Sequence, residues 1–539
     1  SQARYPSTTS EFPLGGMHPN KKGHRVVAEN LNPEIAKALG AALPPAELSG
    51  SLFRVEDKAQ LFVDRLLVRD SERVWFTQRA GRKHPKNPLI VADRPWEGWR
   101  VYVYGSVVHD EQESVFKMYY IAVNDSPEKQ EHFRHAAVTC YAVSKDGVRW
   151  EKPSVGPLPS KNGQPHNAVV ESDVFSVMRD ADDPDPQRRY KAVGFDRNPP
   201  RGYYSYASSD GLHWNREKII APDADVITAH YDPYRKLYVA FPKEHSKHWR
   251  GHGRRLFNTI ASRDFDNWSK PALSWTTDAR DDLGSLARIE RARPVLDRPD
   301  DLDLLRTEYY GIGAYPHESC TIGFPWVLTI NNNARWGNHE GPQEIQLAVS
   351  RDLVNWERPF RTPVIEFGRL GEWDASYHTT VSSALRVGDE IWLYYGGANY
   401  THGTPALYRE NFEDGTPTGR KTKYTAGIGL AIWKLDRFVS VDAPSEGGAL
   451  TTIPFVSTGK RLELNAVTGN GGEIVVELCD AAGKPLPDWP KSDPFVGDDL
   501  RHTVAFQGNA SVSSLAGKPV SLRFHLKSAS LYSFAFRSE

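Results

Sequence analysis

The sequence predicts an all-β protein, in which a five-bladed β-propeller is followed by a β-sandwich and preceded by a short helical segment. Two observations lead to this prediction. A short pattern of Ser, Asp and Trp recurs along the middle of the chain, and the residues after 445 change to short alternating strands with hairpin signals such as Gly469-Asn-Gly-Gly472. Long apolar helical patterns do not accompany either feature.

The recurring pattern is a serine, an aspartate two positions later and a tryptophan six positions after the serine. Complete copies begin at Ser144, Ser208, Ser262 and Ser350, and a degenerate copy with Phe438 in the tryptophan place begins at Ile432. Each follows an apolar run, so each is typical of a strand, a tight turn and a second strand. The aspartate is expected to accept hydrogen bonds from turn amides and the tryptophan to fold back as an apolar plug. Five all-β repeats closed in a ring predict five blades.

The same reading divides the chain into residues 1–50, a loop and helix segment, residues 51–445, the propeller and catalytic domain, and residues 446–539, the sandwich. In the first segment, the run from His18 to His24 leads into an amphipathic helix. This run resembles the last segment of GDSL/SGNH-type esterases, although Gly15 stands where that family has Asp. Because no serine nucleophile block accompanies it, we interpret it as a remnant packed on the propeller.

Composition narrows the function classes. A net charge of −1 with 25% charged residues gives no whole-protein field for nucleic acid or for an anionic membrane. The 3 cysteines are too few and too scattered for a disulfide framework or a cysteine zinc site. The 15 Trp and 23 Tyr residues fit packed sheets, and they also fit surfaces that stack on sugars. The chain begins Ser1-Gln-Ala without Met, which indicates processing, and we expect a secreted or periplasmic protein.

The predicted architecture resembles the five-bladed propeller glycoside hydrolases, the group that includes invertases, arabinanases and neoagarobiose hydrolases. The Trp-x-Asn-Asp-Pro-Asn-Gly and Arg-Asp-Pro signatures of the invertase branch are absent, so fructan chemistry is not supported. The resemblance implies a glycosidase whose acidic residues come from inner strands of different blades and meet at the channel mouth. Such cleavage needs one group to protonate the leaving oxygen and an opposed carboxylate to activate water or to attack.

The candidate acids are those that lie just before predicted inner strands. The catalytic candidates are Asp225, Asp374, Glu318 and Glu97, and Glu171, Asp173 and Glu308 occupy similar positions. A structural reading stands beside each, because acids at such positions also cap turns and bind backbone amides.

The candidate substrate contacts are aromatic, cationic and imidazole side chains at the same strand entrances. They are Trp96, Arg100, His230, His317, Arg335, Trp373 and His378. A protonated histidine can deliver a proton near neutral pH, although hydrogen-bonded scaffolding is the commoner role. The basic stretch from Lys243 to Arg255, together with Arg335 and Trp336, could clamp the carboxylate or sulfate of an anionic sugar. A solvated loop or a subunit contact is the alternative for that stretch.

The sequence therefore predicts a glycoside hydrolase that cleaves a poly- or oligosaccharide, including an anionic one, at the propeller axis. Three alternatives stay open, namely a non-catalytic glycan-binding propeller, a phosphorylase or lyase on the same scaffold, and a protein-interaction propeller. No cofactor is required, and the only ion allowed for is a structural Ca²⁺ or Na⁺ near the axis. Changing Asp225 or Asp374 to Asn is expected to abolish cleavage while the fold survives. Sugar identity, linkage, stereochemistry and oligomeric state are left open.

Overall fold

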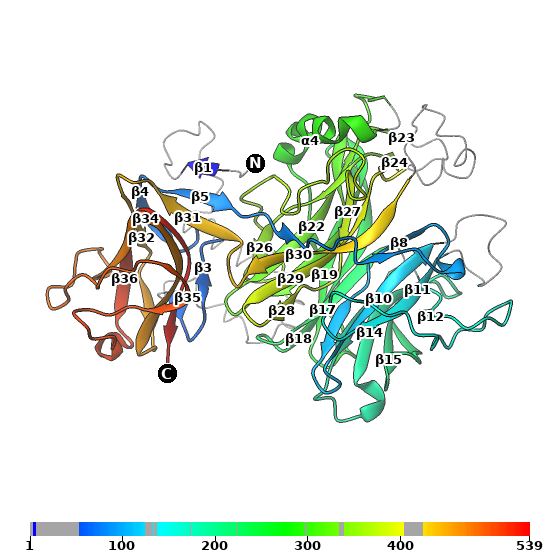
Figure 1. The fold of residues 1–539 in the computed structure, drawn as a ribbon, viewed down its shortest axis with the longest axis horizontal. Coiled ribbons are helices and arrows are strands. Elements are labelled where there is room, and N and C mark those ends of the chain that lie inside the picture. Colours follow the sequence, from blue (N-terminus) through cyan, green and yellow to red (C-terminus); the bar gives the residue numbers. More distant parts are fainter. Residues whose placement is uncertain are drawn as a thin grey trace. The chain divides into compact units, whose positions relative to one another are not determined.

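The computed structural model describes residues 4–6, 53–123, 133, 137–172, 174–222, 224–296, 299–333, 339–403 and 424–538. Strands dominate these ranges (Figure 1), which confirms the all-β class. The α-helices among them are α3 (Ala279–Leu283) and α4 (Ser285–Ala292), and no helix in the described ranges is long and apolar enough to cross a membrane. The predicted helix within residues 1–50 lies outside the described residues. Only Arg4–Pro6 of that segment is described, and it forms β1.

The chain divides into two compact units. The first contains Ser1–Ala80, His317–Thr321 and Trp433–Glu539, and the second contains Gly81–Pro316 and Ile322–Ile432. The sequence places residues 51–445 in the propeller. In the structure β3 (Gln60–Leu61) pairs instead with a strand near the C-terminus, because Phe62 packs against Phe524 and Phe534 at ring distances of 5.9 and 5.8 Å.

The first unit is built on one large sheet. Its main path runs β1-β5-β31-β36-β32-β4, and the two longest strands, β34 and β36, pair antiparallel with each other. The strands are β2 (Phe53–Val55), β3, β4 (Val68–Glu72), β5 (Trp75–Gln78), β31 (Val439–Ala443), β32 (Gly448–Thr452), β33 (Phe455–Ser457), β34 (Arg461–Cys479), β35 (Asp498–Thr503) and β36 (Pro519–Arg537).

The second unit contains three four-stranded antiparallel sheets, each formed by strands consecutive in sequence. The first joins β9 (Val107–Asp110), β10 (Val115–Val123), β11 (Ala137–Ser144) and β12 (Ala168–Val170). The second joins β13 (Phe175–Arg179), β14 (Tyr190–Asp196), β15 (Gly202–Ser208) and β16 (Asn215–Ala221). The third joins β17 (Ile227–Asp232), β18 (Leu237–Trp249), β19 (His252–Ser262) and β20 (Ala272–Trp275).

The remaining strands of the second unit belong mostly to a ten-stranded sheet. Its members are β6 (Arg82–Lys83), β7 (Ile90–Val91), β21 (Arg306–Pro316), β22 (Thr321–Ile330), β25 (Gln343–Ile345), β26 (Ala348–Ser350), β27 (Tyr377–Thr380), β28 (Leu385–Val387), β29 (Glu390–Ala398) and β30 (Ala426–Lys434). The short strands β8 (Arg100–Tyr102), β23 (Asn332–Asn333) and β24 (His339–Glu340) lie outside it.

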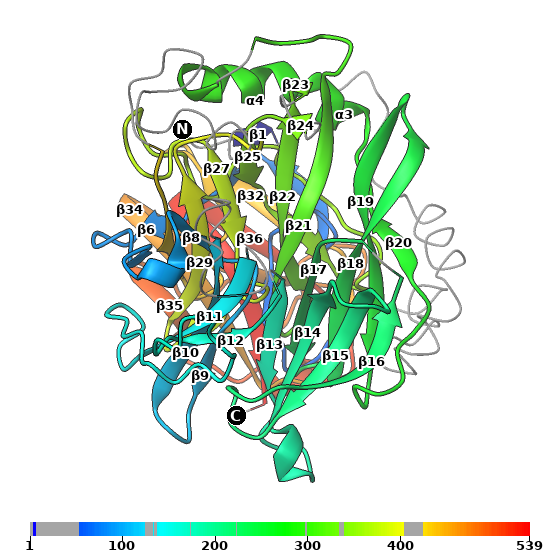
Figure 2. The same cartoon turned by 90° about the vertical axis from the view of Figure 1, so that its right-hand side faces the viewer.

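The first strands of successive sheets lie side by side. Figure 2 shows this for β13, β17 and β21. Buried hydroxyl groups link neighbouring strands, since Thr228 Oγ1 donates to Ile312 O at 2.5 Å and Thr379 Oγ1 donates to Val103 O at 2.8 Å. Ser106 Oγ is 2.6 Å from Ser382 Oγ and accepts a bond of 2.9 Å from Val177 N. Segments far apart in sequence are thereby joined through a polar interior.

The recurring Ser-Asp-Trp motif has the predicted turn geometry. In the first copy, Asp146 Oδ1 accepts from Val148 N at 2.9 Å and Arg149 N at 2.7 Å, and Trp150 Nε1 donates to Gly147 O at 3.1 Å. The aspartates of the other three copies bind their turn amides in the same way. The fourth position has positive φ in all four complete copies, which explains Gly147, while Phe265 and Leu353 adopt φ 66 without being glycine.

Candidate functional site

A cavity of about 140 Å³ in the second unit is lined mainly by tyrosine side chains. Its lining includes Tyr102, Tyr104, Tyr310, Tyr377 and Tyr400, with Arg100, Thr379, His402 and the backbone of residues 396–398. Tyr102 is the last residue of β8, Tyr310 lies within β21 and Tyr377 is the first residue of β27. Three strands distant in sequence thus contribute an aromatic residue to one wall.

The tyrosines offer neutral hydroxyl groups. Burial raises the pKa of Tyr104 and of Tyr377 well above the usual value, and their two Oη atoms are 3.1 Å apart. Because a protonated phenol both donates and accepts hydrogen bonds, this wall matches the hydroxyl groups of a sugar. The Arg100 guanidinium lies over the rings of Trp99 and Tyr102, at 5.1 and 5.4 Å from the ring centroids.

His402 supplies a hydrogen-bond acceptor. Its Nδ1 lies 2.7 Å from His339 O, and since a carbonyl oxygen only accepts, Nδ1 carries the proton and Nε2 keeps its lone pair. Burial, reinforced by the nearby Arg255 guanidinium, lowers the pKa of His402 to about 3, so the ring is neutral at physiological pH. The ring packs edge-on against Tyr310 at 4.6 Å.

Two acid–base pairs flank the ring of Tyr310. Lys243 Nζ lies 5.7 Å from the ring centroid and forms an ion pair with Asp225. The Arg255 guanidinium lies 5.4 Å from the same centroid, and its NH1 is 2.6 Å from Glu308 Oε2. Register explains the pairing of the cations: Arg255 of β19 lies opposite His245 of β18, and Lys243 is on the same face of β18 as His245.

Glu308 is held as a carboxylate. It is 1% exposed, and Arg306 Nε donates to its Oε1 at 2.7 Å. Burial tends to raise the pKa of Glu308, but Arg255 and Arg306 outweigh burial and leave the pKa below its usual value. Asp225 differs, because 46% of its side chain is exposed. The site therefore pairs a buried, ionised carboxylate with a second carboxylate that solvent reaches.

Neutral histidines complete the surroundings of Glu308. Burial lowers the pKa of His245 and of His339 to about 4, and the adjacent arginines add to that shift. At neutral pH the charged groups of this cluster are therefore Lys243, Arg255 and Arg306 against Asp225 and Glu308.

Of the residues predicted from sequence, Arg100 lines the cavity, and Asp225 and Glu308 lie beside it through Lys243 and Arg255, which pack on the ring of Tyr310. Glu97 lies instead in the turn before β8, where Oε1 accepts from Tyr120 Oη at 2.5 Å and pairs with Lys152 at 2.7 Å. Trp96 Nε1 donates to Asn167 Oδ1 at 2.8 Å. These contacts fix the turn to more distant parts of the chain, and neither Glu97 nor Trp96 lines the cavity.

Asp374, Trp373 and His378 form a separate cluster. Asp374 Oδ2 lies 2.6 Å from Lys83 Nζ and accepts from Tyr395 Oη at 2.7 Å. His378 Nε2 is 2.9 Å from Asp374 O, and Trp373 stacks on Tyr395 at 5.6 Å. Asp374, Trp373 and His378 do not line the cavity, although Gly397, which does, packs against the Asp374 and Trp373 side chains.

The other predicted residues lie elsewhere. His230 is 1% exposed and packs against Phe241 at 5.7 Å. Glu318 belongs to the first unit, where it accepts from Ala59 N at 2.6 Å and pairs with Arg537 at 3.0 Å. His317, also in the first unit, is 3.1 Å from Asp436. Burial opposes protonation there, but Asp436 outweighs it and raises the pKa of His317 to about 10. Arg335 and Asp173 lie outside the described residues.

Sequence reasoning missed the tyrosines. A signal was present, because Tyr102 and Tyr104 alternate along one predicted strand and Tyr310 and Tyr377 stand near the start of two others. The predicted site was instead based on charged groups, so the shared position of these tyrosines was not predicted. In the ranges that the structure describes, no group of three or more His, Cys, Asp or Glu side chains has the arrangement of a metal site.

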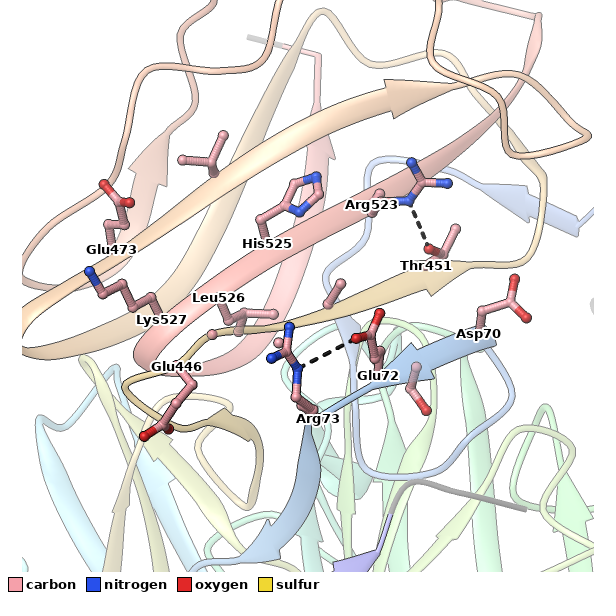
Figure 3. Close-up of a pocket in the computed structure, with 15 residues that line it drawn as sticks. Asp70, Glu72, Arg73, Glu446, Thr451, Glu473, Arg523, His525, Leu526 and Lys527 are labelled. Carbon is pink, nitrogen blue, oxygen red and sulfur yellow. Dashed lines mark hydrogen bonds and ion pairs between the residues drawn. The ribbon is translucent and has the colours of Figure 1, made fainter. Parts of the chain in front are cut away.

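A second hollow, of about 610 Å³, lies on the sheet of the first unit (Figure 3). Beside His525, charged side chains of both signs line it, among them Asp70, Glu72, Arg73, Glu446, Glu473, Arg523 and Lys527. Among the described lining residues there is no Tyr, Trp or Phe. This hollow therefore lacks the stacking surface that the cavity of the second unit provides.

No protein-family model matches the chain, and no curated protein matches it. Among solved structures, the chain is similar to an N-acetylgalactosamine deacetylase from F. plautii (TM-score 0.37, 13% identity, 71% of this chain and 95% of that chain). It is also similar to a β-1,2-mannobiose phosphorylase from Listeria innocua (0.40, 14%, 66% and 97%) and to a GH32 β-fructofuranosidase of Bombyx mori (0.34, 10%, 85% and 94%). At scores and identities this low, the likeness assigns neither a family nor an activity to this chain.

Proposed function

We propose that the protein hydrolyses a glycosidic bond of a poly- or oligosaccharide in the tyrosine-lined cavity. The observation that carries this proposal is the pair of carboxylates beside Tyr310, Asp225 with Lys243 and Glu308 with Arg255. An aromatic wall, neutral hydroxyl groups and two acids are the groups that such a reaction uses.

The two carboxylates suit different tasks. Glu308 stays ionised because Arg255 and Arg306 stabilise its charge, so it is the group that activates water or attacks the anomeric carbon. Asp225 is ionised in its pair with Lys243, so to act as the acid it first takes up a proton from solvent, which its partly exposed side chain allows, and then delivers that proton to the leaving oxygen. Glu97, Asp374 and Glu318 are left out of this assignment, because their bonds hold them in other parts of the fold.

The proposal includes the predicted architecture, with successive sheets of the second unit as the five blades of a propeller and the C-terminal strands as a sandwich. The hydrogen bonds that link Val103, Ser106, Val177, Thr228 and Thr379 to neighbouring first strands support it. It also includes a secreted or periplasmic location, where polymeric glycans are accessible.

The charges of the cluster favour an anionic reactant. Lys243, Arg255 and Arg306 outnumber the two carboxylates by one positive charge, and guanidinium groups bind carboxylate, sulfate and phosphate oxygens well. An acidic sugar is therefore part of the proposal. Phosphorolysis is the second candidate, because the same cations would also receive inorganic phosphate as the attacking group.

The test is a panel of acidic and neutral oligosaccharides, incubated with and without inorganic phosphate and assayed for released sugar. We expect release without phosphate, and its loss in Asp225→Asn. Asp266→Asn is the control, because Asp266 is a partly exposed aspartate that pairs with Lys218 and Arg188, and neither cation packs on Tyr310 as Lys243 does. Release that depends on phosphate would support the second candidate. Binding without any release would reject both and favour a glycan-binding protein.

A further inference from the structure

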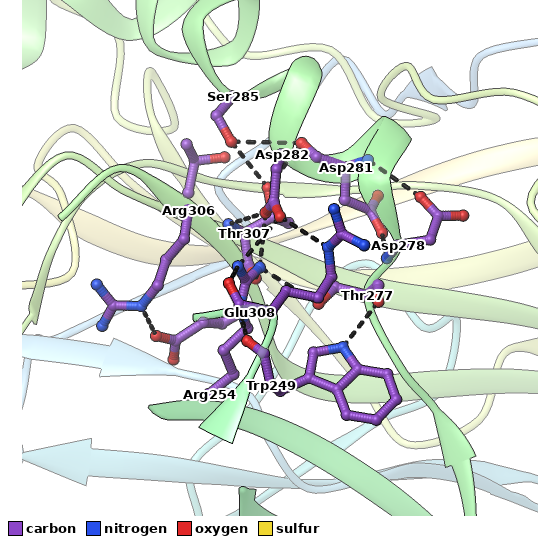
Figure 4. Close-up of polar contacts among 12 residues, drawn as sticks. Trp249, Arg254, Thr277, Asp278, Asp281, Asp282, Ser285, Arg306, Thr307 and Glu308 are labelled. Atoms are coloured by element: carbon purple, nitrogen blue, oxygen red, sulfur yellow. Dashed lines mark hydrogen bonds and ion pairs between the residues drawn. The ribbon is translucent and has the colours of Figure 1, made fainter. Parts of the chain in front are cut away.

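Thr307 lies between the two charged residues that meet at the site. It is fully buried, and it separates Arg306 from Glu308 on β21. Alternate residues of a strand point to opposite faces, so Arg306, Glu308 and Tyr310 share one face and Thr307 points to the other, toward α3 (Figure 4). Whatever fixes Thr307 therefore fixes the direction of both charged side chains.

Every polar group of Thr307 is bonded. Its backbone N donates to Asp282 Oδ1 at 3.2 Å, and its carbonyl oxygen accepts from Arg254 NH1 at 3.0 Å. Its hydroxyl group donates to Asp281 O at 2.9 Å, lies 3.0 Å from Ser285 Oγ and accepts from Arg288. Five partners from the β18–β19 hairpin and from α3 and α4 thus converge on one residue.

The partners of Thr307 are themselves fixed. Arg254 binds Asp282 through both terminal nitrogens, at 2.6 and 3.0 Å. Asp281 is fully buried and pairs with Arg358 and Arg361, and a capping box with Asp278 fixes the start of α3. Trp249 anchors the hairpin by donating to Thr277 O at 2.9 Å. Each charged side chain of this assembly is paired, and its partner makes a further hydrogen bond or ion pair (Figure 4). Such a connected network makes the assembly rigid.

We propose that Thr307 is a positioning residue, through which α3, α4 and the Arg254–Asp282 pair set the placement of Glu308 and Arg306 at the cavity. The role assigned to Glu308 rests on the proposed function, whereas the positioning itself does not. A residue that holds a reacting side chain in place affects the reaction rate even though it does not contact the substrate itself.

The first test is Thr307→Val, which keeps the shape of the side chain and removes its hydroxyl group. We expect kcat to fall by about 10–100-fold with KM within about threefold, and the pH profile of kcat/KM to shift, because Glu308 loses its fixed partners. Thr307→Ser should restore kcat. Thr228→Val is the control, since Thr228 is an equally buried threonine whose hydroxyl bonds a neighbouring strand. Equal kcat values for Thr307→Val and Thr228→Val would overturn the proposal.

The second test needs no activity. Crystal structures of Thr307→Val and of the milder Asp282→Asn are expected to show that the contacts of Glu308 with Arg255 and Arg306, now 2.6 and 2.7 Å, are lengthened or lost. Thr307→Ser should retain them. Retention of both contacts in both variants would overturn the positioning role. If the parent protein releases no sugar, the proposed function fails, while this measurement still decides the positioning.

Discussion

Glu308 and Asp374 are two buried carboxylates of the second unit with closely similar immediate surroundings. Glu308 contacts Arg255 and Arg306 at 2.6 and 2.7 Å, with His339 3.8 Å away. Asp374 contacts Lys83 and Tyr395 at 2.6 and 2.7 Å, with the Nε2 atom of His378 4.0 Å away. By nearest neighbours alone, both have the cationic and imidazole surroundings of a catalytic acid.

Glu308 and Asp374 differ in the contacts that lie beyond their nearest neighbours. Beyond Glu308, Arg255 lies against Tyr310, whose ring lines the cavity. Beyond Asp374, Gly397 separates the acid from the cavity, and a Cβ at Gly397 would come within 2.5 Å of the Asp374 Cβ and 2.7 Å of the Trp373 ring. Close packing of this kind excludes a substrate. The role of a buried acid therefore depends on what its partners face.

The largest contrast is expected from Glu308→Gln. Because an uncharged amide cannot activate water, kcat should fall by about 10²–10⁴-fold. Glu344→Gln is the matched control, since Glu344 is also 1% exposed and paired with an arginine, but Arg291 does not lie over Tyr310 as Arg255 does. Both variants lose a buried charge, so both should lose some stability. Steady-state rates of the two, at a temperature where both are folded, decide the prediction. Equal rates would remove Glu308 from the mechanism.

Asp374→Asn should have the opposite effect, with a loss of stability and little change in the reaction rate. The substitution leaves Lys83, whose side chain is 29% exposed, without its anionic partner, so the free energy of unfolding should drop by about 2 kcal/mol. The rate of sugar release should stay within about threefold of the parent, because Asp374 lies outside the cavity lining. Thermal unfolding and the same rate assay measure the two effects. A rate loss at unchanged melting temperature would place Asp374 in the site after all.

Part of the fold and of the candidate site could be predicted from the sequence. The recurring turns, the all-β class and the position of Asp225 just before a strand, β17, all follow from local patterns of Ser, Asp, Trp and apolar residues. The basic stretch from Lys243 to Arg255 was also visible, as was Glu308. Local patterns suffice here because the turn hydrogen bonds join residues two or three positions apart.

What the sequence did not show depends on register between distant strands. In the sequence Asp374 is adjacent to Trp373 and close to His378, which suggested a catalytic site. In the structure its ion pair joins it to Lys83, 291 positions away. The first unit likewise pairs β5 with β31 through residues such as Phe76 and Val441. No local sequence pattern encodes such pairings. The domain boundaries, and the direction in which each acidic side chain points, could therefore be found only from the structure.

A smaller contrast is expected between Tyr377→Phe and Tyr395→Phe. Tyr377 lines the cavity, so removing its hydroxyl should raise KM by about 3–10-fold, the effect of one lost hydrogen bond. The hydroxyl of Tyr395 binds Asp374, so its loss should lower the free energy of unfolding by about 1 kcal/mol and leave KM unchanged. Michaelis profiles and urea unfolding of both variants provide the measurements. A raised KM in Tyr395→Phe would contradict the separation of the two clusters.

The smallest effect concerns pH. Burial lowers the pKa of His378 from 6.5 to about 4, so the unfolded chain binds a proton between these pH values that the folded protein does not. His378 therefore makes the protein less stable as pH falls from 6.5 to 4, and has no further effect below 4. In His378→Gln, the unfolding free energy should fall less steeply over this window than in the parent, while KM near neutral pH is unchanged because the ring lies in the Asp374 cluster. Parallel slopes for parent and variant would show that His378 is protonated in the fold, and that this cluster is more open to solvent than its packing indicates.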